Sequence, residues 1–506
     1  MVCRHSSLYI LMILFCVSVE AMRMKQRASS LQKSSNAGPV GQGENVVDEP
    51  VTFSEEGRGS EDNPWQLIIA GGGPAGTGPL LNAAANNQWD ALMETGVAVF
   101  EKSEYLISGA FGDRHGSSTS HGYAFQEIAT NAADVLPKTA RHPWIAKLRN
   151  DPHPDFVDVT SFLRDMGAEL AEQITATNGK SRVYFHHSVT LCQWTGSLWR
   201  ITVHDDDLDV NVEHYSRWLL LSTGGRDRVP NPIGRSNINL YDWAKTNPAN
   251  RAKVVPGSEV IWNPQDYRAK LTMERPKVVI IGGAHGAWLI VDILAELPGT
   301  PLDITVIRRS VTKLYDESKE EAEKEGRMTQ PGDICPLTGK VNRQSGVRGT
   351  PRLRVIDMQK TGTSKGLARL QAYDGDDGDH VLALLNAADM VIYSIGFGPN
   401  FPKILDEAGT TAIIKQRRDN GMVIRQEDMF TPVFAQGNVR NVIMYGIGAG
   451  LPCGFNNVKG ELTGGEKRLH GVAPVDSIWL YENDIGAKVV RGMVADYEAK
   501  NVSSSK

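Results

Sequence analysis

The pattern that most constrains this chain is an apolar run that ends in a glycine turn, and it occurs twice. Residues 66–70 lead into Gly71, Gly73 and Gly76, spaced as Gly-x-Gly-x-x-Gly, and a second apolar run follows at 97–100. This order predicts a β-α-β unit whose glycines permit a tight turn, close approach to a pyrophosphate and close helix packing. Free N–H groups at the helix start attract anions, so we predict a dinucleotide site.

An acidic residue completes this first predicted site. Glu101 ends the second apolar run, where a carboxylate accepts hydrogen bonds from ribose hydroxyls. An acid there suits a free 2′-hydroxyl, so the unit is predicted to bind FAD or NAD. The alternative is a glycine-rich strand–helix turn that holds no ligand. The predicted cofactor contacts are Gly71, Gly73, Pro74, Ala75, Gly76, Glu101 and Lys102.

The second copy has the same spacing but the opposite charge at its end. The run at 277–281 leads into a turn of small residues at 282–287, and the run at 304–307 ends on Arg308 and Arg309. Arginines suit a 2′-phosphate, so this unit is predicted to bind NADP. Ala284 holds the middle glycine position and puts a methyl group where the backbone should meet phosphate, so a scaffold without nucleotide is the alternative. The predicted contacts are Gly282, Gly283, Ala284, Ala287, Arg308 and Arg309.

Composition excludes several function classes. The chain has 506 residues, of which 41% are hydrophobic and 22% charged, and this balance is typical of a globular protein with two or three domains. Its formal net charge of −5 gives no reason to expect nucleic acid. The five cysteines form no Cys-x-x-Cys pair and no metal-ligand cluster, so neither a disulfide framework nor a metal site is expected.

The first residues predict targeting rather than fold. Arg4 and His5 precede an apolar stretch at 8–19, and Val19 and Ala21 are small residues at the positions that a signal peptidase reads. This pattern predicts a signal peptide over residues 1–21. The protein would then enter the secretory pathway, to be secreted or kept in an endomembrane lumen. The stretch is short for a membrane span, so none is expected after cleavage. The basic, serine-rich continuation, within 22–63, is predicted to be a disordered linker or a transit-like segment that directs the protein to a plastid.

Between and after the two turns, further strands are predicted. Alternating polar and apolar residues over 182–203 predict a β-meander. It leads into a buried strand that ends at Ser222-Thr223-Gly224, and a second strand of this kind runs over 389–400. A strand at 441–446 and a closing amphipathic helix at 475–493 complete the chain. The predicted architecture is α/β, with one Rossmann-like domain interrupting another.

In this order, the elements resemble the two-dinucleotide-binding-domain flavoproteins. This superfamily includes the pyridine nucleotide–disulfide reductases and the flavin-dependent monooxygenases. Ser222-Thr223-Gly224 is similar to the family's Ala-Thr-Gly return strand. Residues 389–400 match D-x-x-I-x-x-x-G-F-x-P-N, which is more typical of the flavin-containing and N-hydroxylating monooxygenases. No two cysteines lie close in sequence, so disulfide-reductase chemistry is not expected.

The resemblance implies FAD at the first site and NADPH at the second. It implies an FAD-binding domain over 64–272 and 390–498, interrupted by an NAD(P)-binding domain over 273–389, with Thr223, Gly224, Gly448 and Gly450 also near FAD. The implied function is an NADPH-dependent monooxygenase that oxygenates a small molecule through a flavin hydroperoxide. Two alternatives remain: an FAD-dependent dehydrogenase or oxidase with a vestigial nicotinamide site, and a non-catalytic FAD- or nucleotide-binding protein.

The loop after the first unit holds the catalytic candidates. Residues 109–122 are rich in glycine, serine and histidine and follow the predicted FAD-binding strand. Arg114, His115 and His121 in this loop could bind substrate or donate protons. The alternative for each is an ordinary surface or hydrogen-bonded residue. Because the cofactor carries the chemistry in such enzymes, no side-chain nucleophile is required. The sequence identifies no particular substrate.

Overall fold

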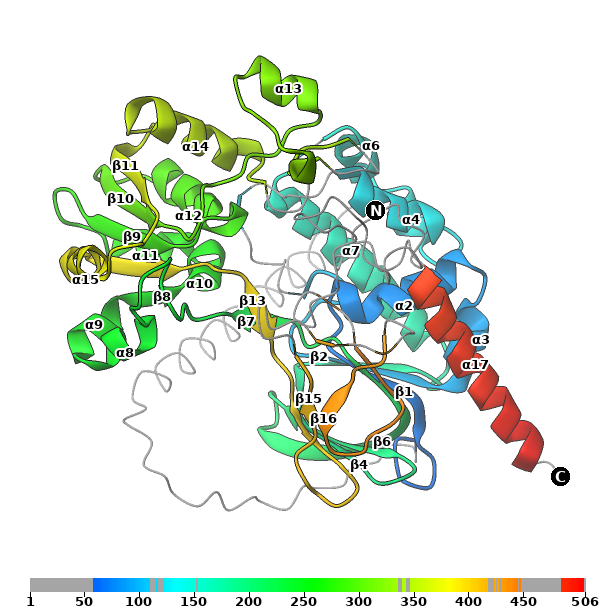
Figure 1. The fold of residues 1–506 in the computed structure, drawn as a ribbon. Coiled ribbons are helices and arrows are strands. Elements are labelled where there is room, and N and C mark those ends of the chain that lie inside the picture. The colour runs from blue at the N-terminus through cyan, green and yellow to red at the C-terminus, as the bar shows by residue number, and fades with distance from the viewer. Residues whose placement is uncertain are drawn as a thin grey trace, which may run out of the picture. The chain divides into compact units, whose positions relative to one another are not determined.

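The structure, a computed structural model, describes residues 58–504 with several gaps (Figure 1). The described part contains two large sheets with helices packed on them, and two small sheets of two strands each. Predictions that concern Arg114, His121, Gly448 and Gly450 lie outside the described residues. The gaps are residues 110–114, 117–121, 152, 335–338, 343–345, 417–422, 425, 427–429, 445 and 447–483.

The first sheet has eight strands and joins a parallel half to an antiparallel meander. The strand β6 connects the two halves, since it pairs with β5 and β17 along one edge and with β1 along the other. The parallel half contains β1 (Trp65–Ala70), β2 (Val97–Glu101), β3 (Arg182–Phe185) and β17 (Val442–Met444). The meander contains β4 (His187–Trp194), β5 (Trp199–Asp205) and β6 (Val210–Leu221), and β14 (Lys403–Leu405) pairs with β4.

The strand β1 is buried on both faces. Leu67 and Ile69 pack into the core beneath the helices, whereas Ile68 and Ala70 pack into the core of the meander side. A continuous apolar run is therefore required at this strand, rather than alternation of polar and apolar residues. On the meander side, β15 (Ile413–Ile414) pairs with β16 (Phe434–Gln436). The helices of this domain are α2 (Pro74–Ala85), α3 (Trp89–Thr95), α4 (Gly122–Asn131), α5 (Pro137–Ala140), α6 (Trp144–Arg149), α7 (Phe156–Thr175) and α17 (Asp484–Ser504).

The second sheet is wholly parallel. Its strand order is β11-β10-β9-β12-β8. The strands are β8 (Val254–Pro256), β9 (Lys277–Ile281), β10 (Leu302–Ile307), β11 (Leu367–Tyr373) and β12 (Met390–Tyr393). Helices cover both faces, as parallel sheets require. They are α8 (Leu240–Lys245), α9 (Pro248–Lys253), α10 (Gly257–Trp262), α11 (Pro264–Ala269), α12 (His285–Glu296), α13 (Lys319–Lys324), α14 (Gly349–Thr361) and α15 (Gly378–Ala387), with a 3-10 turn, η3, at Pro331–Asp333.

Two crossings of the chain join these domains, so the first domain is interrupted by the second as the sequence predicts. The strand β7 (Gly225–Asp227) leaves the first sheet after β6, and β13 (Phe397–Pro399) returns after β12. These two crossings pair with each other as antiparallel strands. The pairing continues on both sides, where Arg228 N–H donates to the Gly396 carbonyl at 3.0 Å and Asn400 N–H donates to Gly224 at 3.4 Å.

The domain boundaries differ from those predicted. The strand β8 pairs with β12, so residues 254–256 belong to the second sheet and not to a first domain running to 272. The sequence did not reveal this strand because it is only three residues long. β12 also belongs to the second sheet, so the return to the first domain comes after residue 393 rather than at 390. Residues 58–63, predicted as linker, pack on the first domain, where Tyr215 N–H donates to the Gly59 carbonyl at 2.7 Å.

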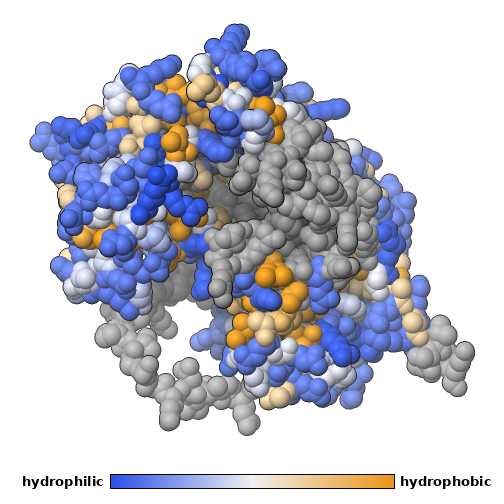
Figure 2. All heavy atoms as spheres, in the orientation of Figure 1, coloured by the Kyte–Doolittle hydropathy of each residue, from blue (hydrophilic) through white to orange (hydrophobic). Residues whose placement is uncertain are grey.

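The surface is hydrophilic in one region of the molecule and apolar in another. On the face shown in Figure 2, hydrophilic residues cover the area around α13, and apolar residues gather over β15 and β16. Ile413 of β15 is 48% exposed. Among the described residues, no helix is both apolar enough and long enough to cross a bilayer.

Candidate functional site

The first glycine turn is wedged between two strands. Gly71 follows β1 with φ +99°, and its N–H donates to the Phe100 carbonyl of β2 at 2.9 Å. A Cβ atom at this position would lie 2.5 Å from the Ser222 carbonyl oxygen at the end of β6. Only glycine fits both the conformation and the space. The first glycine of the motif therefore has the role in the turn that the sequence predicts.

The third glycine brings the helix against the turn. A Cβ atom on Gly76 would lie 1.8 Å from the Gly71 carbonyl oxygen, so any side chain there would displace α2. Gly73 stands before α2 in an extended conformation and gives the helix no side-chain cap. A Cβ atom on Gly73 would meet nothing closer than Gly109 Cα at 3.7 Å. The uncapped start of this twelve-residue helix fits a pyrophosphate.

Glu101 is held in place at the carboxyl end of β2. It is 7% exposed, and its two carboxylate oxygens accept hydrogen bonds from Gly72 N–H at 2.7 Å and from Ser103 N–H and Oγ at 2.8 Å each. A carboxylate has about four acceptor positions, so these three bonds leave room for a ribose hydroxyl. The role of Glu101 as a ribose ligand stays a prediction that this geometry permits, and Lys102 is exposed beside it.

The second turn repeats this geometry. Gly282 has φ +146°, its N–H donates to the Ile307 carbonyl at 2.8 Å, and a Cβ atom there would lie 2.2 Å from the Ser394 carbonyl oxygen. Ala284 precedes α12 at φ −96° and ψ −177°, close to the −67° and −172° of Gly73. The second turn therefore has the same shape as the first, although alanine stands where the motif has glycine. Ala284 is exposed, and like Gly73 it provides no side-chain cap for its helix, α12.

The residue at the end of the second strand corresponds to Glu101. A Cβ atom on Gly283 would lie 2.9 Å from Arg308 Cβ, just as one on Gly72 would lie 3.2 Å from Glu101 Cβ. Arg308 and Glu101 thus occupy equivalent places with opposite charges. Arg309, one residue further along, is exposed.

Two residues that the sequence analysis missed lie beside these arginines. Arg308 Nε donates to Asp374 Oδ1 at 2.7 Å, and Arg235 Nε donates to the Arg309 carbonyl at 2.7 Å. Asp374 follows β11, which lies next to β10 in the sheet, and Arg235 comes from the segment between β7 and α8. Asp374 could have been predicted, because the run Asp374-Gly375-Asp376-Asp377 places acidic residues directly after a strand. No sequence signal pointed to Arg235.

Small polar residues end the two return strands at matching places. Ser222 N–H donates to the Ala70 carbonyl at 2.9 Å, and Ser394 N–H donates to Ile281 at 2.8 Å. Ser222 Oγ also donates to the Gly71 carbonyl at 2.7 Å, which locks the turn to β6. Thr223 donates through Oγ1 to the Asn400 carbonyl, so its hydroxyl ties the two crossings together, and its contact with FAD stays a prediction. Gly224 beside it is exposed, with φ +72°.

Of the three catalytic candidates, the structure describes only His115. It is exposed, and its backbone N–H donates to the Ile261 carbonyl of α10 at 3.2 Å. The next residue, Gly116, lies against α12, since a Cβ atom there would be 2.5 Å from Leu289 Cδ1. This part of the loop therefore bridges the two domains. The catalytic role of His115 stays a prediction.

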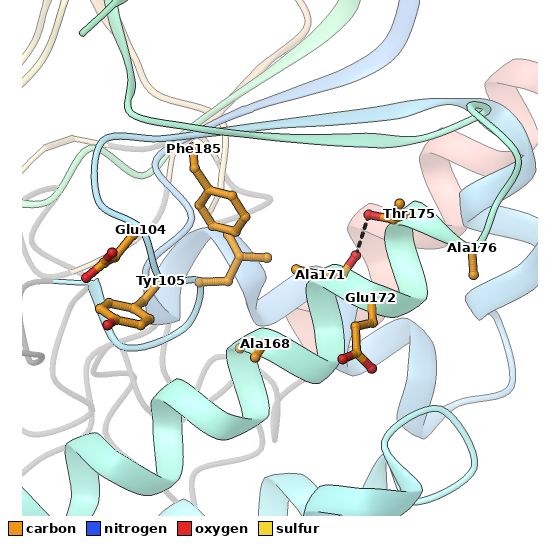
Figure 3. A pocket seen from close by; sticks show the side chains of 10 residues that line it. Glu104, Tyr105, Ala168, Ala171, Glu172, Thr175, Ala176 and Phe185 are labelled. Carbon is orange, nitrogen blue, oxygen red and sulfur yellow. Dashed lines mark hydrogen bonds between the residues drawn. The ribbon is translucent and has the colours of Figure 1, made fainter. Parts of the chain in front are cut away.

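A separate groove of about 680 Å³ lies between α7 and the edge strand β3 (Figure 3). Tyr105, Ala168, Ala171 and Phe185 give it a largely apolar lining, and Glu104 and Glu172 add carboxylates. Leu106 lines the groove and also touches the first turn, since a Cβ atom on Gly72 would lie 2.5 Å from its Cδ2. The groove is thus separated from the turn by Leu106, and it contains none of the predicted cofactor contacts.

Comparison with known proteins places this geometry in context. No family model matches the chain. Ornithine hydroxylase from Pseudomonas aeruginosa has a similar structure, with a TM-score of 0.52 and 15% identity over 85% of this chain and 99% of that one. Ornithine N-hydroxylase from Kutzneria sp. 744, solved with reduced FAD, NADP⁺ and L-ornithine, gives a TM-score of 0.51 and 15% identity over 87% of this chain and 100% of that one. This protein has the fold of the two-dinucleotide-binding-domain flavoproteins.

In sequence, the chain is similar to a curated hydroxylase. It is 28% identical over 452 residues to the CMP-5′-(3-aminopropyl)phosphonate hydroxylase of Streptomyces rubellomurinus, which covers 85% of this chain and 98% of the relative. The predicted fold is confirmed by the two structural similarities. The relatives also agree with the predicted class, an FAD- and NADP-dependent oxidoreductase of the monooxygenase type.

Proposed function

We propose that this protein is an FAD-dependent monooxygenase that uses NADPH to hydroxylate a small amine. The observation that carries the proposal is the pair of matching turns with opposite charges, Glu101 behind the first and Arg308 behind the second. A carboxylate suits the ribose hydroxyls of FAD, and a guanidinium suits a cofactor with a 2′-phosphate. A chain with one site of each kind can receive electrons from NADPH and use them at a flavin.

The residues around the first turn would hold FAD. Gly73 and the uncapped start of α2 would meet the pyrophosphate, and Glu101 would accept from the ribose. The start of α12, with Gly282 before it and Arg309 nearby, would hold the pyrophosphate and 2′-phosphate of NADPH. Bound FAD supplies electron transfer and activation of molecular oxygen, so the chain itself has to position the reactants and exclude water.

An amine is the substrate class that the relatives favour. The curated relative acts on an aminopropylphosphonate joined to CMP, and two structural relatives are ornithine hydroxylases. N-hydroxylation balances as R–NH₂ + O₂ + NADPH + H⁺ → R–NHOH + H₂O + NADP⁺. One oxygen atom enters the N–O bond and the other leaves as water, while NADPH provides two electrons. The similarity to the curated relative extends along nearly its whole length, so an amine carried on a phosphonate or a nucleotide is the substrate we test first.

The test is an anaerobic titration of the purified flavoprotein with NADPH, followed by air and a panel of amines. The panel contains CMP-5′-(3-aminopropyl)phosphonate, 3-aminopropylphosphonate and L-ornithine. We expect NADPH to bleach the flavin, and one amine to yield a hydroxylamine in step with NADPH consumption. A flavin that NADPH leaves oxidised but that a substrate reduces would instead indicate a dehydrogenase or oxidase. Bound flavin that no donor reduces would indicate a non-catalytic protein.

We also propose where the protein is targeted, and only the amino-acid sequence of its first residues supports this part. The apolar stretch at 8–19 after Arg4 and His5 is typical of a signal peptide, so we propose that the protein enters the secretory pathway. The basic segment after residue 21 leaves a plastid destination as an outcome of the test. N-terminal sequencing of protein purified from its native cells, with localisation of a fluorescent fusion, would distinguish these destinations. A mature chain that begins at Met1 would contradict the proposal.

A further inference from the structure

The geometry points to Asp374 as the residue that sets the choice between NADPH and NADH. This inference rests on the proposed use of NADPH. Arg308 stands where an arginine would meet the 2′-phosphate, yet Asp374 already binds it. We propose that Asp374 competes with the 2′-phosphate for Arg308, so that Arg309 and Arg235 carry most of the phosphate binding.

Arg308 is fixed at the predicted phosphate position by its backbone. It follows β10 directly, and its N–H donates to the Tyr373 carbonyl of β11 at 2.8 Å. Its Cβ lies against Gly283 of the second turn, the contact that Glu101 makes with the first turn. The side chain is only 14% exposed. Arg308 therefore cannot move far to meet a ligand, and the ligand must come to it.

Asp374 is equally well placed as a partner. Its carboxylate accepts from Arg308 Nε at 2.7 Å and is 37% exposed. The following residue, Gly375, packs closely on Gly234, and its carbonyl accepts from Arg235 N–H at 2.8 Å. An ion pair shielded from water on the arginine side interacts more strongly than one on an open surface. A 2′-phosphate approaching Arg308 would meet this carboxylate as a like charge.

The other two arginines lie further toward solvent. Arg309 and Arg235 are both exposed, and Arg235 Nε donates to the Arg309 carbonyl at 2.7 Å, so the two residues are neighbours. A second carboxylate, Asp376, is also close: the Tyr373 hydroxyl and the Arg235 charge are among the causes that lower its pKa. With three arginines and nearby acids at one edge, the local charge is nearly balanced. A site of this composition should favour NADPH, with its doubly charged 2′-phosphate, only weakly over NADH.

The test compares Asp374→Asn with the unmodified holoenzyme. Asparagine retains an oxygen that accepts from Arg308 Nε but removes the negative charge. Affinities for NADP⁺ and NAD⁺, and for 2′,5′-ADP and 5′-AMP, are measured by calorimetry on the FAD-loaded protein. We expect NADP⁺ and 2′,5′-ADP to bind roughly tenfold more tightly in the variant, with less gain at high salt, because the change removes one like charge near the phosphate. Binding of NAD⁺ and 5′-AMP should change by less than about twofold.

Asp379→Asn is the matched control. It removes the same charge from an exposed position in the first turn of α15, five residues further along. It should leave the ratio of NADP⁺ to NAD⁺ affinity as in the unmodified protein. An unchanged ratio in Asp374→Asn, with both cofactors still binding, would overturn this inference and leave the proposed function standing. An unmodified protein that binds neither cofactor would overturn both.

Two arginine variants test the inference even if Asp374→Asn folds poorly. Arg309→Gln changes an exposed side chain and should weaken NADP⁺ roughly tenfold or more, as the loss of a direct phosphate contact does. Arg308→Gln should weaken it less, since in the proposed arrangement Arg308 donates to Asp374 rather than to the phosphate. The reverse order of effects would show that Arg308 meets the phosphate directly and that Asp374 does not compete.

Discussion

At the residue scale, one position in each repeat decides how closely a helix can approach its turn. Gly76 and Ala287 hold the same place in the two motifs. A Cβ atom on Gly76 would lie 1.8 Å from the Gly71 carbonyl oxygen, whereas the real Cβ of Ala287 is fully buried without such a clash. The two turns therefore have the same backbone shape, but the helix of the second turn leaves room for about one more methyl group. The shared motif does not reveal this difference.

This difference predicts opposite tolerances at the two positions. Gly76→Ala should force α2 away from the turn and lower the FAD content, because the new methyl group cannot fit. Ala287→Gly should keep NADP⁺ binding and reduce stability by only about 1 kcal/mol, the usual effect of glycine in a helix. The ratio of flavin to protein absorbance and the NADP⁺ affinity measure the two outcomes. A Gly76→Ala protein that retains its full flavin would contradict the geometry of the first turn.

A buried histidine on the meander side predicts sensitivity to acid. His214 is 6% exposed, with ring centroids 4.9 Å from Phe100 and 5.4 Å from Tyr184. Burial, followed by the nearby His187, lowers the pKa of His214 from 6.5 to about 4. The native state therefore resists a proton that the unfolded chain binds below pH 6.5, so stability falls as the pH falls from about 6.5 toward about 4.

Replacing this histidine should flatten that dependence. Between pH 7 and pH 5 the unmodified protein should lose about 2 kcal/mol of unfolding free energy through His214, and His214→Phe should lose correspondingly less. Urea denaturation at both pH values measures the two losses. The slope with pH is the readout, since the substitution also changes packing at every pH. Equal losses in both proteins would mean that His214 is not kept neutral by its surroundings.

At the element scale, one carboxylate gathers several of the polar contacts between the long helix α17 and the first sheet. Gln66 also donates to the Met493 carbonyl of this helix at 3.2 Å. Asp496 accepts hydrogen bonds from Gln66 Nε2 at 3.0 Å and Trp218 Nε1 at 3.2 Å, and it pairs with Lys500 at 2.8 Å. Burial alone would raise the pKa of Asp496, but these donors outweigh it and lower the pKa. The carboxylate thus stays charged and holds the helix against β1 and β6.

Removing this carboxylate should loosen the helix. Asp496→Ala removes the acceptor of the Trp218 indole N–H and one of the two acceptors of the buried Gln66 amide, whose bond to the Met493 carbonyl remains. A buried donor without an acceptor typically costs about 1–3 kcal/mol. We expect a lower melting temperature and earlier proteolytic cleavage near residue 484, where α17 begins. Glu498→Ala, an exposed carboxylate two residues away, is the control and should change neither. Matching melting temperatures for the two variants would contradict the role of Asp496.

Elements also show how far sequence reasoning reaches in this chain. The strands that lead into the turns could be predicted because their burial on both faces demands a continuous apolar run, as at 66–70 and 277–281. The short strand β8 could not, since three residues carry no periodicity. Arg235 could not be predicted as a neighbour of Arg309 either. That contact depends on how a long, irregular segment folds back, and no local pattern encodes it.

At the scale of the whole molecule, a few residues of the first domain reach into the core of the second. Phe156 begins α7 of the first domain, yet its side chain is 5% exposed and packs in the hydrophobic core that contains α12. Its N–H donates to the Gly116 carbonyl at 2.8 Å, and Gly116 lies against Leu289 of α12. These contacts link the helix of the second turn to the first domain. Hydride transfer needs the two cofactors in a fixed relation, so the contacts bear directly on the proposed function.

Phe156→Ala should therefore slow the reduction of the flavin by NADPH without removing the flavin. Loss of the aromatic ring leaves a cavity next to α12, and a displacement of about 1 Å between reactants reduces rates up to roughly a hundredfold. The rate is measured anaerobically from the loss of flavin absorbance at saturating NADPH. The FAD content and the affinity for NADP⁺ should stay close to those of the unmodified protein, because both glycine turns lie outside the altered contact.

Val157→Ala provides the control for this substitution. Val157 is the next residue of α7 and is 55% exposed, so its truncation changes the same helix turn but leaves the second core intact. It should reduce the flavin at the normal rate. If both variants behaved normally, the packing of Phe156 would serve stability alone, and the alignment of the two cofactors would depend on the paired crossings β7 and β13. If both were equally slow, the cause would be a disturbed start of α7 rather than the contact with the second domain.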